Sequence, residues 1–142
     1  MKRLFIFGLI ALLCTGCNNA KTDGNRSEKR QEAEEAGQIC IEKAREALSR
    51  RDLKTAREQI LSLRENYRLA LDAREEGILI MDSIELFEAQ KALQTADSLL
   101  QTCTDSASAR FQELKANFDE QCQRIKFYHR KIQHDKANKT KH

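Results

Sequence analysis

The near absence of helix-breaking residues constrains the fold more than any other feature of the sequence. The chain has no proline, and of its five glycines only Gly37 and Gly77 lie beyond residue 24. Ala, Glu, Lys, Leu, Arg and Gln, which favour helix, are abundant throughout. No segment alternates apolar and polar residues with β-branched enrichment, as a half-buried strand would. We therefore expect an all-α fold with no sheet.

Apolar residues at helical spacing divide residues 27–135 into four expected helices. The helices would span residues 27–50, 53–67, 69–101 and 107–134, with Asp52 as the N-cap of the second. The first two would form a short hairpin. The last two carry apolar residues three and four positions apart, which is typical of a coiled-coil seam, and would form a long antiparallel hairpin. We expect the short hairpin to pack on the long one.

Large and small residues lie opposite each other in the expected long hairpin. Equal steps from a turn at residues 102–106 pair Phe111 with Ala96 and Phe118 with Ala89. Residues 78–81 are apolar in all directions around a helix, so this part of the third helix should be buried on several sides. The third helix is therefore the expected centre of the domain.

The first residues are typical of an export signal. A basic start, MKR, precedes an apolar run at residues 4–14, which as a helix would reach only about 16 Å, whereas a bilayer core measures about 30 Å. The run ends in Cys14-Thr15-Gly16-Cys17. This motif resembles the lipobox of bacterial lipoproteins, in which a small residue and a glycine precede the cysteine that becomes lipidated. Cys14 stands where the family usually has Leu.

This resemblance implies a division of the chain. Residues 1–16 would be a lipoprotein signal peptide, and residues 17–26 a flexible tether lipidated on Cys17. Residues 27–135 would be the helical domain, and residues 136–142 a disordered basic tail. The resemblance places the protein in the cell envelope, and Asn18 in place of an Asp favours the outer membrane over the inner one. A plain thiol at Cys17, after a simple signal peptide, is the alternative.

Residues 40–67 resemble a single tetratricopeptide-type (TPR-like) helix pair. The resemblance rests on the small and apolar positions of that pattern, which are Ala44, Ala47, Ala56, Ile60 and Leu63. It implies a surface that binds another protein. We find no second copy of the pair, so it would be a lone unit and not a solenoid.

No motif of a known catalytic centre follows the signal. The sequence lacks a glycine-rich phosphate loop, a GxSxG motif and an HExxH motif. His129 and His134, five residues apart, diverge on a helix. We therefore expect no enzyme, no cofactor and no metal site. An oxidising compartment leaves a disulfide between Cys40 and Cys122 open.

The expected function is that of a non-catalytic helical binding or scaffold module with a protein partner in the envelope. The alternative is a carrier of a small apolar ligand or lipid, in a pocket beside residues 78–87. Residues 124–142 hold seven Lys or Arg against one Asp, and an export signal argues against nucleic acid as their partner. These cations could instead contact an anionic surface; the candidates are Arg124, Arg130, Lys131, Lys136, Lys139 and Lys141.

Overall fold

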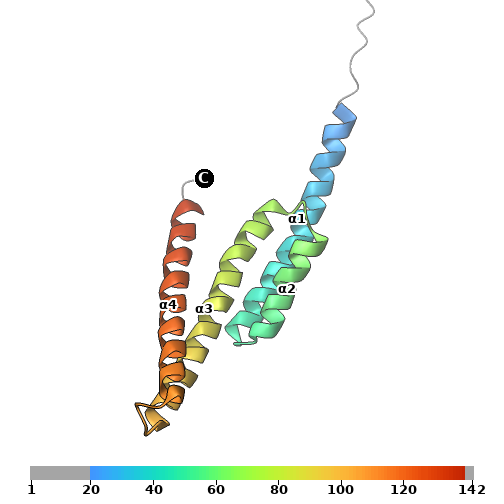
Figure 1. Cartoon of the computed structure of the whole chain (residues 1–142). Helices are drawn as coiled ribbons and strands as arrows, with labels where there is room; N and C mark the ends of the chain where they lie inside the picture. The colour runs from blue at the N-terminus through green and yellow to red at the C-terminus, as the bar shows by residue number, and fades with distance from the viewer. Residues whose placement is uncertain (1–19, 140–142) are drawn as a thin grey trace, which may run out of the picture.

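The computed structural model describes the backbone of residues 20–139 and the side chains of residues 27–139. This part of the chain forms four helices and no strand: α1 (Ala20–Ser49), α2 (Leu53–Asn66), α3 (Leu71–Thr102) and α4 (Ala109–Lys139) (Figure 1). The helices pack on one another, so the expected all-α fold is confirmed. The short α1–α2 hairpin packs on the long α3–α4 hairpin, as expected.

Each helix runs in the opposite direction to the one before it (Figure 1). The α1–α2 hairpin lies on one side of α3 and α4 lies on the other side. Within the described residues, α4 contacts α3 and contacts neither α1 nor α2. Consequently α3 is the central element, and α4 ends at the same end of the molecule at which α1 begins (Figure 1).

The apolar core lies between α1, α2 and the first half of α3. The small side chains of Ala44 and Ala47 are fully buried in one cluster with Ile60 and Leu63 of α2 and Ile84 of α3. A stripe of alanines on α1 allows the other two helices to approach it closely. The expected apolar face of the first hairpin is therefore the face that forms the core.

The turn between α1 and α2 is closed by its own backbone. Arg51 adopts a left-handed conformation with φ of 60°. Its N–H donates to the carbonyl of Leu48 at 3.0 Å, and the N–H of Asp52 donates to that of Ala47 at 2.9 Å. Asp52 is the N-cap of α2, as expected: its carboxylate accepts a hydrogen bond of 3.1 Å from the N–H of Thr55. Hydrogen bonding of the Asp52 carboxylate with the side chain and the backbone of Thr55 lowers the pKa of Asp52.

The apolar stretch of α3 is buried on two sides and not on all sides. Ile80 and Ile84 are buried, whereas Ile78 is 42% exposed. The prediction that residues 78–81 are buried on several sides therefore holds only in part. The reason is the arrangement of the neighbours: α2 and α4 flank α3 without meeting, and part of the α3 surface between them stays open.

The pairing of α4 with α3 differs from the expected register. Asp82 bonds to Lys131, whereas the expected pairing, continued in equal steps, would place Ile125 opposite Asp82. Lys131 lies six residues beyond Ile125, and Arg124, which bonds to Glu85, lies two residues beyond the expected partner of Glu85. The pairing is therefore displaced by between two and six residues relative to the prediction. The physical cause is the start of α4. The hydroxyl of Ser108 accepts a hydrogen bond from the N–H of Phe111 at 3.1 Å, so the turn extends to residue 108.

Two expected boundaries were wrong. The backbone of residues 20–26, the larger part of the expected flexible tether, belongs to α1, and residues 136–139 of the expected disordered tail belong to α4. Gly24 does not end the helix, because one glycine costs only about 1 kcal/mol in a helix interior.

The expected signal peptide, Cys17 and Lys141 lie outside the described residues. Within residues 20–139, no helix combines the length and the apolar character that crossing a membrane requires.

Candidate binding surface along α3

Glu85 of α3 links the two helices that flank it. Its carboxylate accepts a hydrogen bond from Arg57 of α2 at 2.8 Å and one from Arg124 of α4 at 3.2 Å. The hydroxyl of Tyr128 lies 3.5 Å from the same carboxylate. The other nitrogen of the Arg57 guanidinium donates to Glu88 at 2.7 Å. Helices α2 and α4, which do not touch each other, are thus joined through one acidic side chain.

These contacts change how readily two groups of the network ionise. The hydrogen bonds that Arg57 donates, first to Glu88 and then to Glu85, raise the pKa of Arg57, although burial opposes them. Burial and the nearby negative charge of Glu85 raise the pKa of Tyr128. The cation of Arg57 and the neutral phenol of Tyr128 are therefore both favoured by the fold.

Asp82 is a buried carboxylate, 7% exposed, one turn before Glu85. The ammonium group of Lys131 donates to Asp82 and also to Asp135, at 3.1 Å. Burial alone would lower the pKa of Lys131, but the bonds to the two carboxylates outweigh burial and raise it. The pKa of Asp135 is lowered by its hydrogen bonds to His134 and Lys131. Charged groups, in addition to apolar contacts, therefore hold the end of α4 on α3.

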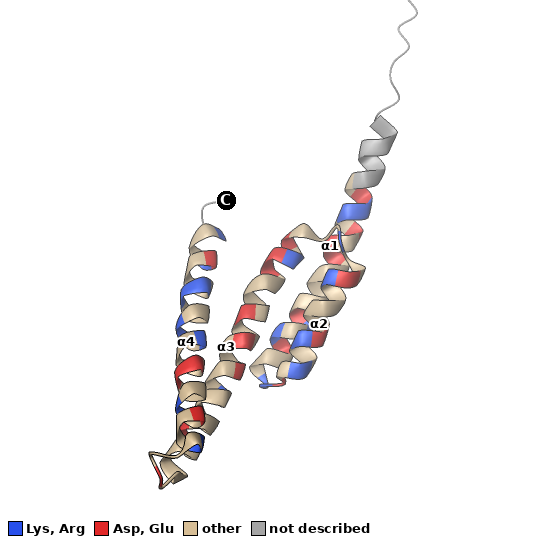
Figure 2. Cartoon of the chain, in the orientation of Figure 1, with Lys and Arg blue, Asp and Glu red and all other residues tan. Residues whose placement is uncertain are grey.

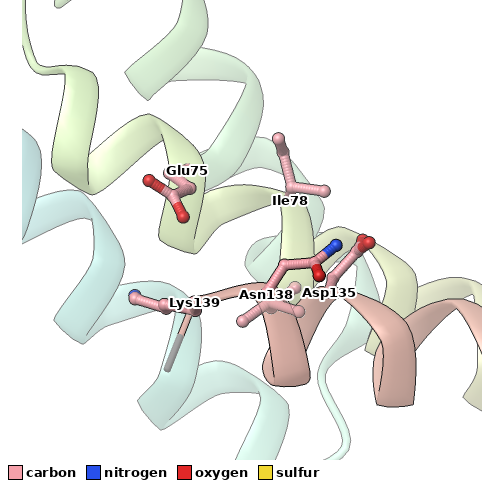
Figure 3. Close-up of a pocket in the computed structure, with 6 residues that line it drawn as sticks. Glu75, Ile78, Asp135, Asn138 and Lys139 are labelled. Atoms are coloured by element: carbon pink, nitrogen blue, oxygen red, sulfur yellow. The ribbon is translucent and has the colours of Figure 1, made fainter. Parts of the chain in front are cut away.

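A hollow of about 220 Å³ lies beyond these ion pairs, between the start of α3 and the end of α4. Figure 3 shows Glu75 and Ile78 from α3 near Asp135, Asn138 and Lys139 from α4. Its lining thus combines apolar side chains, Ile78 and Leu79, with charged or polar ones from both helices. A hollow with such a lining is suited to binding one apolar side chain of another molecule whose neighbouring groups are polar.

A second hollow, of about 510 Å³, adjoins the first on the α2 side. Glu75 and Ile78 line both hollows, and Arg64 of α2 lies at the edge of the second. We call the α3 residues that line this second hollow the α3 strip; they are Leu71, Arg74, Glu75 and Ile78. The α3 strip is an open surface with an apolar residue at each end, Leu71 and Ile78, and the charged Arg74 and Glu75 between them. It is bordered by α2 on one side and α4 on the other.

The wall expected for a ligand carrier, residues 78–87, is divided between three environments. Ile80, Ile84 and Leu86 are buried and line neither of the two hollows. Ile78 belongs to the α3 strip. The ring of Phe87 is covered by the guanidinium of Arg51, whose central carbon lies 3.9 Å from the ring centre.

The expected basic residues also fall into groups. Arg124 and Lys131 have carboxylate partners inside the protein, in Glu85 and Asp82. Arg130, Lys136 and Lys139 are exposed on α4. The structure therefore separates cations that stabilise the hairpin from cations that face the solvent.

The three cysteines of the described chain, Cys40, Cys103 and Cys122, form no disulfide with one another. Cys40 belongs to the α1–α2 core, whereas Cys122 belongs to α4, which does not contact α1. Across residues 27–139, no group of three or more His, Cys, Asp or Glu side chains is arranged to hold a metal ion.

Comparison of the chain with family models, with curated proteins and with solved structures found no match. The likeness of residues 40–67 to a tetratricopeptide-type pair therefore stays a prediction, although those residues do form part of a helical hairpin.

Asp82 and Glu85 were not predicted as binding partners of α4. A signal for them was present: they are acidic residues in a mostly apolar stretch of α3, and Arg124 and Lys131, seven residues apart, are basic residues on one side of the last helix. Only the correct register of the two helices, however, shows which acid meets which base.

Proposed function

We propose that this chain is a lipid-anchored protein of the bacterial cell envelope that acts as a non-catalytic helical binding module. The anchor would be a lipid on Cys17, and the outer membrane is the more favoured location. The observation that carries the binding role is the exposure of Ile78, the last residue of the α3 strip, which lines both hollows between two helices that leave it uncovered. Its partner would be a protein that offers an amphipathic helix with an apolar anchor residue.

The anchor is supported by the lipobox-like residues 14–17 after a basic and apolar start. Acyl chains on one cysteine hold a protein at a membrane stably when two or more are present. Mass spectrometry of the mature protein should find the lipid on Cys17, and Cys17→Ala should block processing and release the protein from the membrane fraction. Unchanged cleavage and unchanged fractionation of this variant would contradict the anchor.

The binding surface is tested by a charge on the α3 strip. We expect Ile78→Glu to leave the fold intact, because Ile78 is already exposed, and to abolish recovery of the partner from solubilised membranes. Leu99→Glu is the matched control, since Leu99 belongs to the same helix and is 40% exposed. Recovery of the same partner by both variants at the native level would contradict binding at the α3 strip.

The alternative function, transport of a small apolar ligand or lipid, is favoured by one observation, the apolar lining of the first hollow by Ile78 and Leu79. Ligand pockets usually enclose about 300–1,000 Å³ and bury most of their ligand. The hollow of about 220 Å³ is smaller, and its lining residue Ile78 is partly exposed. Native mass spectrometry distinguishes the two functions. A lipid bound in stoichiometric amount by the native protein and lost in Ile78→Glu would support the carrier and contradict the binding module.

A further inference from the structure

An exposed aromatic residue lies between cations on the outer side of α4. Phe127 is 53% exposed, and Lys126 and Arg130 beside it are exposed as well. Residues three and four positions apart share one side of a helix, so Gln123, Phe127 and Arg130 lie on one side, next to Lys126. We call these four residues the α4 outer face.

The cations of the α4 outer face are not used inside the protein. Within the described residues, Lys126 and Arg130 form no ion pair with a carboxylate. The Nε of Arg130 donates a hydrogen bond to the carbonyl of Lys126 in its own helix, at 3.2 Å. By contrast, Arg124 and Lys131, which face α3, are bound to Glu85 and Asp82. The outward positive charge is therefore available to an external anion.

Nothing in the described fold covers this face. Helix α4 packs on α3 alone, so its opposite side is open along its length. Lys and Arg predominate on the second half of α4, whereas most charges on the facing half of α3 are acidic (Figure 2). Asp119 and Glu120 precede the α4 outer face by about one turn, so the basic region begins after them and continues toward the end of the helix.

The position of the face in the molecule is also informative. The second half of α4 lies toward the end of the molecule at which α1 begins (Figure 1). In the sequence, Cys17 lies three residues before the first residue of α1. A lipid on Cys17 would therefore keep the α4 outer face close to a bilayer. Binding of the face to that bilayer would be an intramolecular step, which needs little affinity of its own.

We propose that the α4 outer face docks on an anionic phospholipid surface, with Phe127 inserted at the level of the head groups and Lys126 and Arg130 beside lipid phosphates. This inference rests on the lipid anchor proposed above. An aromatic side chain flanked by Lys and Arg on a helix is the combination that lies in a membrane interface. Each basic residue near an anionic membrane strengthens binding about five-fold, and salt weakens it.

The sequence contains no tryptophan, so Phe127→Trp gives a single fluorescent probe at the centre of the proposed contact. The full chain, expressed with its own N-terminal segment and purified from membranes, would be reconstituted in vesicles of neutral phospholipid, with or without phosphatidylglycerol. Leu61→Trp is the matched control, because Leu61 is 50% exposed and belongs to α2. Emission wavelength and quenching by brominated acyl chains report whether each tryptophan contacts lipid.

We expect the tryptophan at position 127 to shift to shorter wavelength and to be quenched on anionic vesicles at low salt, and the tryptophan at position 61 to remain as in solution. Adding Lys126→Ser and Arg130→Ser should lower the ratio of docked to undocked protein about twenty-five-fold. A probe at 127 that responds no more than the probe at 61, or that is unaffected by removing both cations, would overturn the docking proposal.

Sedimentation with the vesicles separates this result from a failure of the anchor. Protein that stays with the vesicles without a response at position 127 refutes docking and leaves the anchor intact. Protein that lacks the lipid on Cys17 but responds at position 127 on anionic vesicles refutes the anchor and supports docking.

Discussion

The carboxylate of Glu34, in α1, caps the first turn of α3 by accepting a hydrogen bond of 2.6 Å from the backbone N–H of Ala73. It accepts a second, of 3.2 Å, from the N–H of Asp72. The N-cap residue of α3 is Ala70, which makes no side-chain capping bond. Helix α1 therefore supplies the acceptor that a Ser or Asp at that position would provide, with a negative charge that suits the helix N-terminus.

We predict that Glu34→Ala lowers the free energy of unfolding by about 0.5–2 kcal/mol, the range observed for loss of an N-cap. Urea unfolding followed by circular dichroism measures it. Glu35→Ala is the control: Glu35 is exposed and bonds to Gln31 of its own helix, so its loss should change stability by less than about 0.5 kcal/mol. Equal effects of the two substitutions would show that the cap contributes no stability.

The same region depends on a glycine. A Cβ added at Gly37 would lie 2.8 Å from the Cβ of Ala70 and 3.0 Å from that of Ala73. Both neighbours are fixed to the backbone, so the helices would have to move apart. We predict that Gly37→Ala destabilises the protein by about 1–3 kcal/mol, although alanine is the better helix former.

Gly77→Ala provides the comparison. Its added Cβ would meet the end of the Leu63 side chain at 3.2 Å, and that end can rotate. We therefore expect a smaller loss of stability than for Gly37→Ala in the same thermal unfolding experiment. A Gly37→Ala protein at least as stable as the native one would mean that α1 does not approach α3 this closely.

The contact between Glu34 and α3 illustrates what could not be predicted from sequence. Helix formation, the absence of strands and the N-cap at Asp52 depend on local spacing and propensity, and these were predicted correctly. The cap on α3 joins residues nearly forty positions apart, and no local pattern connects them. Its existence depends on the tertiary path of the chain.

The candidate site was predictable only in outline. The apolar stretch around Ile78 identified the central helix of the fold, but of residues 78–87 only Ile78 and Leu79 line a hollow between α3 and its neighbours. The exposure of Ile78 could not be predicted, because it depends on α2 and α4 not contacting each other. The pairing of Asp82 with Lys131 was also missed, since the expected turn was placed too early and the register of the long hairpin changed with it.

Arg51 combines an unfavourable backbone conformation with a favourable side-chain contact. Its φ of 60° suits glycine better, while its guanidinium lies over Phe87. Arg51→Gly should gain about 1 kcal/mol from the backbone and lose about 0.5–1 kcal/mol of cation–π attraction, so the net change should be small. In a Phe87→Leu background the attraction is already absent, and the same substitution should stabilise the protein. The test compares the free energies of unfolding of the native protein, Arg51→Gly, Phe87→Leu and the double variant. Identical effects of Arg51→Gly in the native and Phe87→Leu backgrounds would refute the contact between Arg51 and Phe87.

Alkaline pH should weaken the α3–α4 hairpin through Lys131 and Tyr128. The pKa of each is raised in the folded protein, so the folded state keeps protons that the unfolded chain begins to lose near about pH 10. The stabilisation from these groups is complete below the unfolded pKa values and is lost as the pH rises through the higher folded values.

We predict that the difference in free energy of unfolding between the native protein and Lys131→Gln decreases between about pH 9 and about pH 12. Lys126→Gln, which removes a solvent-facing cation from the same helix, should show no such decrease. A constant difference for Lys131→Gln across this range would contradict the ion pair with Asp82.

The proposed binding role depends on whether a partner protein occupies the α3 strip in the cell. The most direct measurement places a photoreactive benzoylphenylalanine at position 78, and separately at position 99, in the full chain, and irradiates intact cells. We predict one cross-linked species of defined mass at position 78 and none at position 99, with the position 78 species lost when Arg64 and Leu71 are also changed to Glu. No cross-link at position 78, or the same products at both positions, would contradict a binding surface along α3.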